Sequence, residues 1–471
     1  MVESLEPRDR KSPNPDIAVR DATGEISRGF LMRLAAAIAD RDTLSLRSFT
    51  SNLHEADLGD VLAALSGEQR KALARLLGDH FDFAVLTEID EAMRREIVNS
   101  LPNAVVARGV QDLDSDDAVF ILEDLDHPEQ QDILSQIPVK DRIQLQRSLD
   151  YPEDSAGRRM QSDFIAIPPF WTVGQTIDAL REDDALPDEF YKIFVVDPAF
   201  RLVGTVALDR LLRSKRPVTI EAIVDEARFV VRATDDQEDA ARIFERYNLL
   251  SAAVIDESDR LVGVLTIDDI VDVIHEEADE DIKRLGGVGD EELSDSVLTT
   301  ARLRLPWLLI NSVTAFAAAT VISLFEATIA EIVALAILLP IASALGGNAG
   351  TQSMTVAVRA LATREISRSS APRIIAREGL VGLMTGSILA IVTGCASALW
   401  FESTTLGLVL AAAMSMTVLL ATLLGILVPL TLGKLGADPA VASGVFVTTI
   451  TDMFGFFMFL GLATWAFGMM P

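Results

Sequence analysis

The feature that most constrains this chain is a set of long apolar segments in its last third. A helix needs about 20 apolar residues to cross a bilayer. Five segments from residue 305 onward reach that length: 305–325, 329–361, 379–400, 406–433 and 439–467. The chain's net charge of −29 lies almost entirely before them. The sequence therefore predicts an acidic soluble region followed by an all-α membrane domain (305–471).

The basic residues of the membrane region predict its orientation. When the acidic region is placed in the cytosol, the Lys and Arg side chains fall on the cytosolic side: Arg359, Arg364, Arg368, Arg373, Arg377 and Lys434. Cytosolic loops carry an excess of such residues. We therefore expect a multi-pass protein of the bacterial inner (plasma) membrane, with the N-terminus in the cytoplasm and the C-terminus outside it.

The N-terminal region indicates further limits. Residues 1–27 are polar and contain no apolar signal segment, so we expect a disordered tail without a cleaved leader. The strong acidity argues against nucleic acid as a partner, because binding it requires a basic face. The same acidity suits cations.

Asp452 is an isolated charge deep inside the last apolar segment. An acidic side chain at mid-bilayer costs about 2.5–3.5 kcal/mol on insertion scales. Thr448 and Thr449 lie on the same helical face. Two interpretations remain open, a polar contact with a neighbouring helix or a cation site in a water-filled path. Acidic side chains within membrane spans usually mark ion pathways, which favours the cation site.

The second apolar segment contains the motif GGNAG at 346–350. Glycine and proline weaken a helix interior, so we expect this span to be broken. Gly346, Gly347 and Asn348 would then present backbone and amide oxygens to a pore, since irregular backbone at membrane depth is tolerated where it lines an aqueous cavity. The alternative is a close helix crossing through small residues.

Short helical repeats occupy the first part of the soluble region. Residues 88–102 align without gaps on residues 124–138, and apolar positions recur at helical spacing in both. This pattern predicts a superhelical N domain over 28–154. Repeats of this kind are also typical of protein-interaction scaffolds.

A second repeat predicts an α/β module. Residues 190–212 resemble residues 248–271, each with two strands followed by a helix. This repeat resembles a tandem pair of CBS domains, predicted at 155–215 and 216–275. Such pairs are often dimeric, nucleotide-binding and regulatory, whereas the simpler alternative is a structural spacer.

An acidic stretch, residues 267–285, leads from this module towards the membrane domain. We expect a connecting or plug helix over 276–304. Glu277, Glu280 and Asp281 share one helical face, where like charges repel. A solvated surface is the usual explanation, but carboxylates gathered near a pore would also form a divalent-cation sensor.

The order of these parts resembles the MgtE family of magnesium channels. The resemblance covers residues 28–471 and is carried by YPEDSAGRRM, GGNAGTQS and DPAVASGVFVTTITD. It implies a homodimer in the lipid bilayer with a pore on the two-fold axis. It also implies that the acidic plug helix closes the pore when cytosolic magnesium is high.

Several site residues follow from this resemblance by position. Asp452 matches the pore aspartate that holds Mg²⁺, and Asp438 matches a residue facing the plug. Magnesium sensing is implied for Asp269, Asp272, Glu277, Glu280, Asp281, Asp236, Glu238, Asp116 and Asp117. Some members also bind ATP at the CBS pair. Two positions depart from the family, with Val445 replacing a common proline and Asn248 replacing a sensing acid.

We therefore expect a Mg²⁺-selective channel for passive uptake that cytosolic Mg²⁺ closes. No nucleotide-hydrolysis motif is present, and the spans contain no nucleophile–base pair, so an enzyme is not expected. Transport of Co²⁺, Ni²⁺ or Mn²⁺ by the same architecture remains an alternative, as does a Mg²⁺ sensor that transports nothing. An anion channel is disfavoured because the charge buried in the spans is negative.

Overall fold

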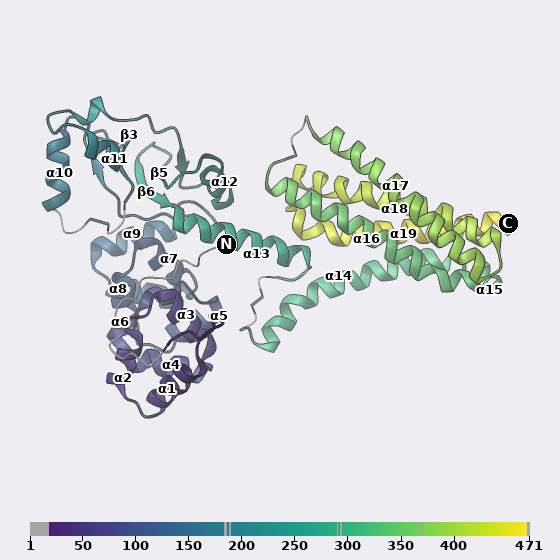
Figure 1. Ribbon diagram of the computed structural model, residues 1–471, viewed down its shortest axis with the longest axis horizontal. Coiled ribbons are helices and arrows are strands. Elements are labelled where there is room, and N and C mark those ends of the chain that lie inside the picture. The colour runs from purple at the N-terminus through teal and green to yellow at the C-terminus, as the bar shows by residue number, and fades with distance from the viewer. Residues whose placement is uncertain are drawn as a thin grey trace. The chain divides into compact units, whose positions relative to one another are not determined.

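The computed structural model describes residues 18–182, 186–187, 190–289, 291–292, 294–366 and 369–468. They form two compact units, Met1–Glu276 and Glu277–Pro471, which are treated separately below (Figure 1). Most of the expected tail, and Arg368, lie outside the described residues. Val19 and Ile26, placed in that tail, pack against the core of the N domain.

The N domain is a succession of short helices around one apolar core, as predicted (Figure 1). Its elements are α1 (Arg28–Ala39), α2 (Thr43–Thr50), α3 (Glu55–Ala64), α4 (Gly67–Leu77), η1 (Gly78–His80), η2 (Phe83–Leu86), α5 (Glu91–Val98), α6 (Asn103–Gln111), α7 (Ser115–Glu123), α8 (His127–Gln136) and α9 (Val139–Leu149). Aspartates begin several of them. Asp90, for example, accepts a hydrogen bond of 2.9 Å from the Met93 amide, which stabilises a helix N-terminus.

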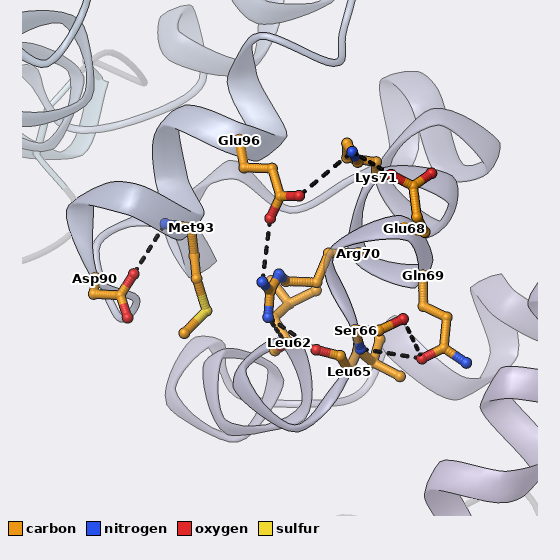
Figure 2. Close-up of polar contacts among 10 residues, drawn as sticks. All are labelled: Leu62, Leu65, Ser66, Glu68, Gln69, Arg70, Lys71, Asp90, Met93 and Glu96. Atoms are coloured by element: carbon orange, nitrogen blue, oxygen red, sulfur yellow. Dashed lines mark hydrogen bonds and ion pairs between the residues drawn. The ribbon is translucent and has the colours of Figure 1, made fainter. Parts of the chain in front are cut away.

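A partly buried arginine, Arg70, joins consecutive repeats of this domain (Figure 2). Arg70 of α4 donates hydrogen bonds to the carbonyls of Leu62 (3.3 Å) and Leu65 (2.9 Å). Its guanidinium also donates to Glu96 of α5 at 3.1 Å. These contacts satisfy carbonyls at the end of α3 that have no partner within the helix.

The same arrangement recurs further along the chain. Arg94 donates to the carbonyls five and eight residues before it and pairs with Asp124. Gln130 donates to the carbonyl eight residues before it, at 3.1 Å. The repeat visible in the sequence is therefore also a repeat of polar contacts.

Two small sheets of the same topology follow. Their elements are β1 (Ala166–Ile167), α10 (Val173–Glu182), β2 (Lys192–Val196), β3 (Leu202–Ala207), α11 (Leu208–Arg213), η3 (Ile220–Ala222), β4 (Val230–Arg232), α12 (Gln237–Tyr247), β5 (Ser251–Ile255), β6 (Leu261–Thr266) and α13 (Ile267–Leu285). The orders are β1-β2-β3 and β4-β5-β6. In each sheet the first pair is parallel, the second is antiparallel, and the middle strand carries a register shift near its end. The tandem α/β module is confirmed.

The two halves exchange segments in a way that the predicted division at 215/216 did not anticipate. Ile220 and Ile223 complete the core of the first half. Conversely, the Gly157 amide donates to the Ala233 carbonyl at 2.8 Å, and Met160 is buried in the core of the second half. These segments are irregular, so no periodicity in the sequence assigns them.

The second unit is an all-α bundle, which confirms the expected fold class of the membrane domain. Its helices are α14 (Val297–Ser323), α15 (Glu326–Glu331), α16 (Ala334–Ala362), α17 (Ala371–Trp400), α18 (Thr404–Lys434) and α19 (Pro439–Ala466) (Figure 1). Five helices in the described part of the chain are long and apolar enough to cross a membrane. Among these, α18 is the most buried by its neighbours and α14 the least.

The second span is interrupted, but not at the glycine motif. The break lies at Ile332 and Val333, between α15 and α16, whereas residues 346–350 are helical. The prediction of irregular backbone at the motif is therefore wrong. A Cβ atom on Gly346 would lie 2.8 Å from Thr417 Cγ2, so this glycine allows α16 to approach α18 closely. The small-residue crossing was the correct alternative.

The connecting segment also differs from the predicted helix over 276–304. Helix α13 begins inside the CBS module at Ile267 and ends at Leu285. The first membrane helix begins at Val297, where Ser296 accepts a hydrogen bond of 3.3 Å from the Thr299 amide. The capping serine explains why α14 starts eight residues before the apolar segment.

Candidate functional site

Asp452 lies in the middle of α19 and is half-buried. Its Oδ1 accepts a hydrogen bond of 2.6 Å from the Ser343 hydroxyl on α16. The carboxylate therefore joins two helices and keeps part of its surface exposed in the protomer. The sequence did not indicate Ser343, because a serine in an apolar span is an ordinary residue.

The threonines predicted beside Asp452 bond to their own helix. Thr448 donates to the Gly444 carbonyl at 2.8 Å, and Thr449 donates to the Val445 carbonyl at 2.6 Å. Their oxygens keep lone pairs that can accept from the water shell of an ion. Helix α19 runs without interruption through Val445.

The residues predicted from the glycine motif separate into different faces of α16. Gly347 follows Ser343 by four residues and lies on the same face. A Cβ atom added to it would meet nothing within 4 Å. Asn348 is exposed and follows Ser343 by five residues, which places it about 140° further round the helix. In the protomer, Ser343 and not Asn348 therefore contacts Asp452.

A second acidic contact lies between membrane helices. Glu378 of α17 accepts a hydrogen bond of 3.0 Å from the buried Ser353 of α16. The predicted third span began one residue later, so the sequence analysis did not consider this carboxylate.

The first unit brings four of the predicted sensing residues together, two from α7 and two from α13. Burial raises the pKa of Asp116 well above its ordinary value, and the adjacent Asp269 adds to the effect. Burial, followed by the charge of Asp269, raises the pKa of Asp117 to about 7. Burial also raises the pKa values of Asp269 and Asp272. This acidic cluster consists of Asp116, Asp117, Asp269 and Asp272.

The acidic cluster has the chemistry of a site for a hard cation. Carboxyl groups held in contact favour either a shared proton or a bound cation. Oδ1 of Asp116 is buried without a hydrogen-bond partner among the described residues. Mg²⁺ prefers oxygen ligands, so the donors fit it. A ready-made group of three or more acidic, His or Cys ligands is not present in the described part of the chain.

Arg159 lies beside this cluster and was missed by the sequence analysis. Its guanidinium pairs with Glu276 of α13 at 2.7 Å and donates to Gln237 of α12 at 3.0 Å. It also lies 5.1 Å from the ring centroid of Phe120 in α7. Burial raises the pKa of Glu276 and Arg159 opposes that change. Arg159 thus connects the N domain, the second CBS half and α13.

Two further predicted sensing residues, Asp236 and Glu238, have structural partners in α12. Asp236 caps α12 by accepting a hydrogen bond of 2.8 Å from the Glu238 amide, and Glu238 pairs with Arg242. Asn248 ends the same helix with φ of 51°. Asparagine tolerates this left-handed conformation better than most residues, which gives the departure from the family pattern a conformational reason.

In the second unit, the end of α13 contacts the first turn of α19. Asp438 caps α19 by accepting a hydrogen bond of 2.7 Å from the Ala440 amide. Arg284 pairs with both Asp438 (2.5 Å) and Glu280. Leu285 packs against a cluster that contains Met354, Val358, Ala440 and Val447. The predicted approach of Asp438 to the connecting helix is therefore present, and Glu277 and Asp281 lie partly buried on that helix.

A cavity of about 300 Å³ lies in the CBS module. Its lining includes Lys192, Phe194, Asp225, Arg228 and Phe229. Desolvation lowers the pKa of Lys192. The cavity combines two cationic side chains and two acids, Asp225 and Glu226, with aromatic rings.

Comparisons with known proteins agree across the chain. The MgtE divalent cation transporter family matches residues 339–462, the MgtE intracellular N domain matches 53–154, and the CBS domain matches 220–276. The chain is 31% identical to the magnesium transporter MgtE of Thermus thermophilus over 438 residues, covering 91% of this chain and 97% of that protein. It is 36% identical to the Enterococcus faecalis magnesium transporter MgtE over 321 residues, 68% of this chain and 71% of that protein.

A solved structure is also similar to the soluble part. It is the cytosolic domain of the Mg²⁺ channel MgtE in complex with ATP, 28% identical, with a TM-score of 0.48. It covers 52% of this chain and 99% of that chain. On the strength of its curated relatives and of the family matches in its N, CBS and membrane regions, the chain belongs to the MgtE family.

Proposed function

We propose that this protein transports Mg²⁺ through the membrane by a path that passes Asp452. The observation that carries the proposal is the half-buried carboxylate on α19, held from α16 by Ser343. Similarity to curated magnesium transporters over nine tenths of the chain supports the choice of ion. Mg²⁺ keeps several water ligands and is bound through one or two carboxylates, which suits a single aspartate per protomer.

Transport is passive and channel-like in this proposal. The membrane potential favours entry of a divalent cation by about 4.6 kcal/mol per 100 mV, at about 2.3 kcal/mol per charge. The acidic region lies in the cytosol, and two protomers place their Asp452 side chains at a shared two-fold axis. Asn348, Gly346, Gly347, Thr448 and Thr449 belong to the path as oxygen donors or as small residues that shape it.

Growth of a strain that lacks magnesium uptake tests this proposal. Wild-type protein should restore growth at low Mg²⁺, whereas Asp452→Ala should not, although it reaches the membrane in equal amount. Rescue by Asp452→Ala would refute the path. If the wild-type protein restores growth equally well when Co²⁺, Ni²⁺ or Mn²⁺ is supplied in place of Mg²⁺, the result would favour another divalent cation. Failure of the wild type to rescue would favour a sensor that transports nothing.

Closure by cytosolic Mg²⁺ is the second part of the proposal. The acidic cluster would bind Mg²⁺ between α7 and α13, and Glu277, Glu280 and Asp281 would bind it further along α13. Changing the ratio of closed to open channels from 1:99 to 99:1 takes about 5.5 kcal/mol. One site specific for the closed state supplies at most about 1.4 kcal/mol per tenfold rise in Mg²⁺. Closure over a single decade therefore needs about four such sites.

Neutralising the helix acids tests this part. The triple variant Glu277→Gln, Glu280→Gln, Asp281→Asn should need more internal Mg²⁺ to stop influx into liposomes, because fewer sites favour the closed state. Glu91→Gln, which neutralises an acid that pairs with Arg95 within α5, is the matched control and should close like wild type. Unchanged inhibition of the triple variant would remove α13 from the gating account.

The CBS cavity is a second ligand site in our proposal, with ATP as its ligand. Lys192 and Arg228 suit the phosphates. Phe229, whose ring centroid lies 4.1 Å from that of Tyr247 with the two ring planes at 30°, suits the base. ATP should raise the melting temperature of the full-length protein, and Phe229→Ala should reduce that rise. An identical rise in the variant would exclude this cavity.

A further inference from the structure

We propose that Ser343 is a positioning residue of the ion path, whose hydroxyl fixes the carboxylate of Asp452 for the passing cation. This inference rests on the proposed function of Asp452. Ser343 would not coordinate the cation itself. The Ser343 hydroxyl would hold Oδ1 of Asp452 and thereby set the direction in which Oδ2 of Asp452 points towards the cation.

The hydrogen bond of Ser343 differs from those of many other hydroxyls in the spans. Ser387, for example, donates to the Leu383 carbonyl of its own helix at 2.6 Å, the usual arrangement in a helix interior. Ser343 donates across to a carboxylate on another helix, also at 2.6 Å. Hydrogen bonds to charged groups are about twice as strong as neutral ones. The contact is therefore strong enough to select one rotamer of Asp452.

The surrounding packing holds both partners in place. Thr417 of α18 lies against Gly346, which follows Ser343 by three residues, and against Gly455, which follows Asp452 by three residues. A Cβ atom on these glycines would lie 2.8 Å and 3.2 Å from Thr417 Cγ2. Helices α16, α18 and α19 thus cross at close range beside the Ser343–Asp452 pair. Sites built on helices locked by such packing keep their geometry precisely.

Fixing the carboxylate affects how the ion is recognised. Mg²⁺ demands near-ideal octahedral geometry, whereas larger cations tolerate more irregular ligands. Without the Ser343 hydroxyl, Asp452 keeps its charge but is free to rotate. Conduction should persist, with weaker binding of Mg²⁺ and less preference for it. This pattern separates positioning from the loss of the charge itself.

Full-length protein in liposomes that contain a Mg²⁺-sensitive dye tests the inference. Ser343→Ala should raise the half-saturating Mg²⁺ concentration about tenfold, the size expected for one charge-assisted hydrogen bond, and should lessen the preference for Mg²⁺ over the larger Ca²⁺. Ser343→Thr keeps the hydroxyl and should behave as wild type. Ser387→Ala, which removes a hydroxyl bonded within its own helix, is the control and should also behave as wild type.

The outcomes separate this inference from the proposed function. Wild-type affinity and preference in Ser343→Ala would overturn the inference, as would a Ser343→Thr variant that behaves like Ser343→Ala. If Asp452→Ala still carries Mg²⁺, the proposed path fails as well. If Ser343→Ala does not fold, Ser343→Cys replaces it, because a thiol is only a weak donor and should give the same loss of affinity.

Discussion

At the scale of single residues, three aspartates differ because their surroundings differ. Asp438 caps a helix and pairs with Arg284, so its charge is balanced locally. Asp117 is half-buried among other acids, and its pKa rises to about 7. Asp452 is held across two helices by Ser343. The sequence identified all three as acids of interest, but only the contacts distinguish their roles.

Stability of the Mg²⁺-free protein should fall as pH rises from about 6 to about 8. Asp117 and Glu123 have pKa values of about 7 in the fold, against ordinary values of 3.8 and 4.5. At pH values between the ordinary pKa and the raised pKa, the folded state binds more protons than the unfolded state. Unfolding therefore becomes easier as pH rises towards and through about 7. Thermal unfolding of the full-length protein with a chelator measures this.

Asp117→Asn provides the comparison for the pH experiment. It removes one titrating group and should reduce the difference in melting temperature between the two pH values. A melting temperature that rises with pH in the wild type would show that these acids are not buried as described.

At the scale of elements, the membrane helices show which parts of the sequence are informative. Apolar length predicted the five long apolar helices found among the described residues, because a bilayer requires such length. Several of these helices extend beyond the apolar part. Composition at 346–350 was misleading, since glycine weakens a helix and also allows helices to approach. Ser343 could not be predicted, because its role depends on α19, more than a hundred residues away. The exchanged CBS segments have no periodicity to detect.

Gly425 tests the importance of close packing between α16 and α18. A Cβ atom there would lie 2.6 Å from the Gly350 carbonyl oxygen and 2.9 Å from the Met354 amide. Backbone atoms cannot move aside easily, so Gly425→Ala should destabilise the bundle by about 1–3 kcal/mol. Thermal unfolding in detergent measures the loss.

Gly347→Ala is the matched control for this experiment. Its Cβ atom would meet nothing within 4 Å in the protomer, and alanine favours a helix over glycine by about 1 kcal/mol. The variant should be at least as stable as wild type. Equal destabilisation of the two variants would contradict the packing described.

At the scale of the whole molecule, the proposed regulation depends on which positive charges balance the carboxylates of the soluble domains. The N domain, the second CBS half and α13 meet at Arg159, within the first unit. Arg159 supplies positive charge there, and the acidic cluster beside it would obtain its compensation from Mg²⁺. The sequence predicted the acids through their spacing and a family resemblance. Arg159 lies in the motif YPEDSAGRRM, but no spacing or charge pattern in the sequence indicated its contacts.

Replacing Arg159 should make the protein more dependent on Mg²⁺. In Arg159→Gln, Glu276 loses its partner, so added Mg²⁺ should raise the melting temperature more than it does in wild type. Arg242→Gln is the control, because Arg242 pairs with Glu238 and Asp239 on its own helix. Equal Mg²⁺-induced shifts in Arg159→Gln and wild type would contradict this role.

The most direct test of the central claim is Mg²⁺ influx into liposomes at a fixed, inside-negative potential. Wild-type protein should admit Mg²⁺ at a rate that grows with the potential, and Asp452→Ala, inserted in equal amount, should admit none. Influx through Asp452→Ala at the wild-type rate would contradict the account.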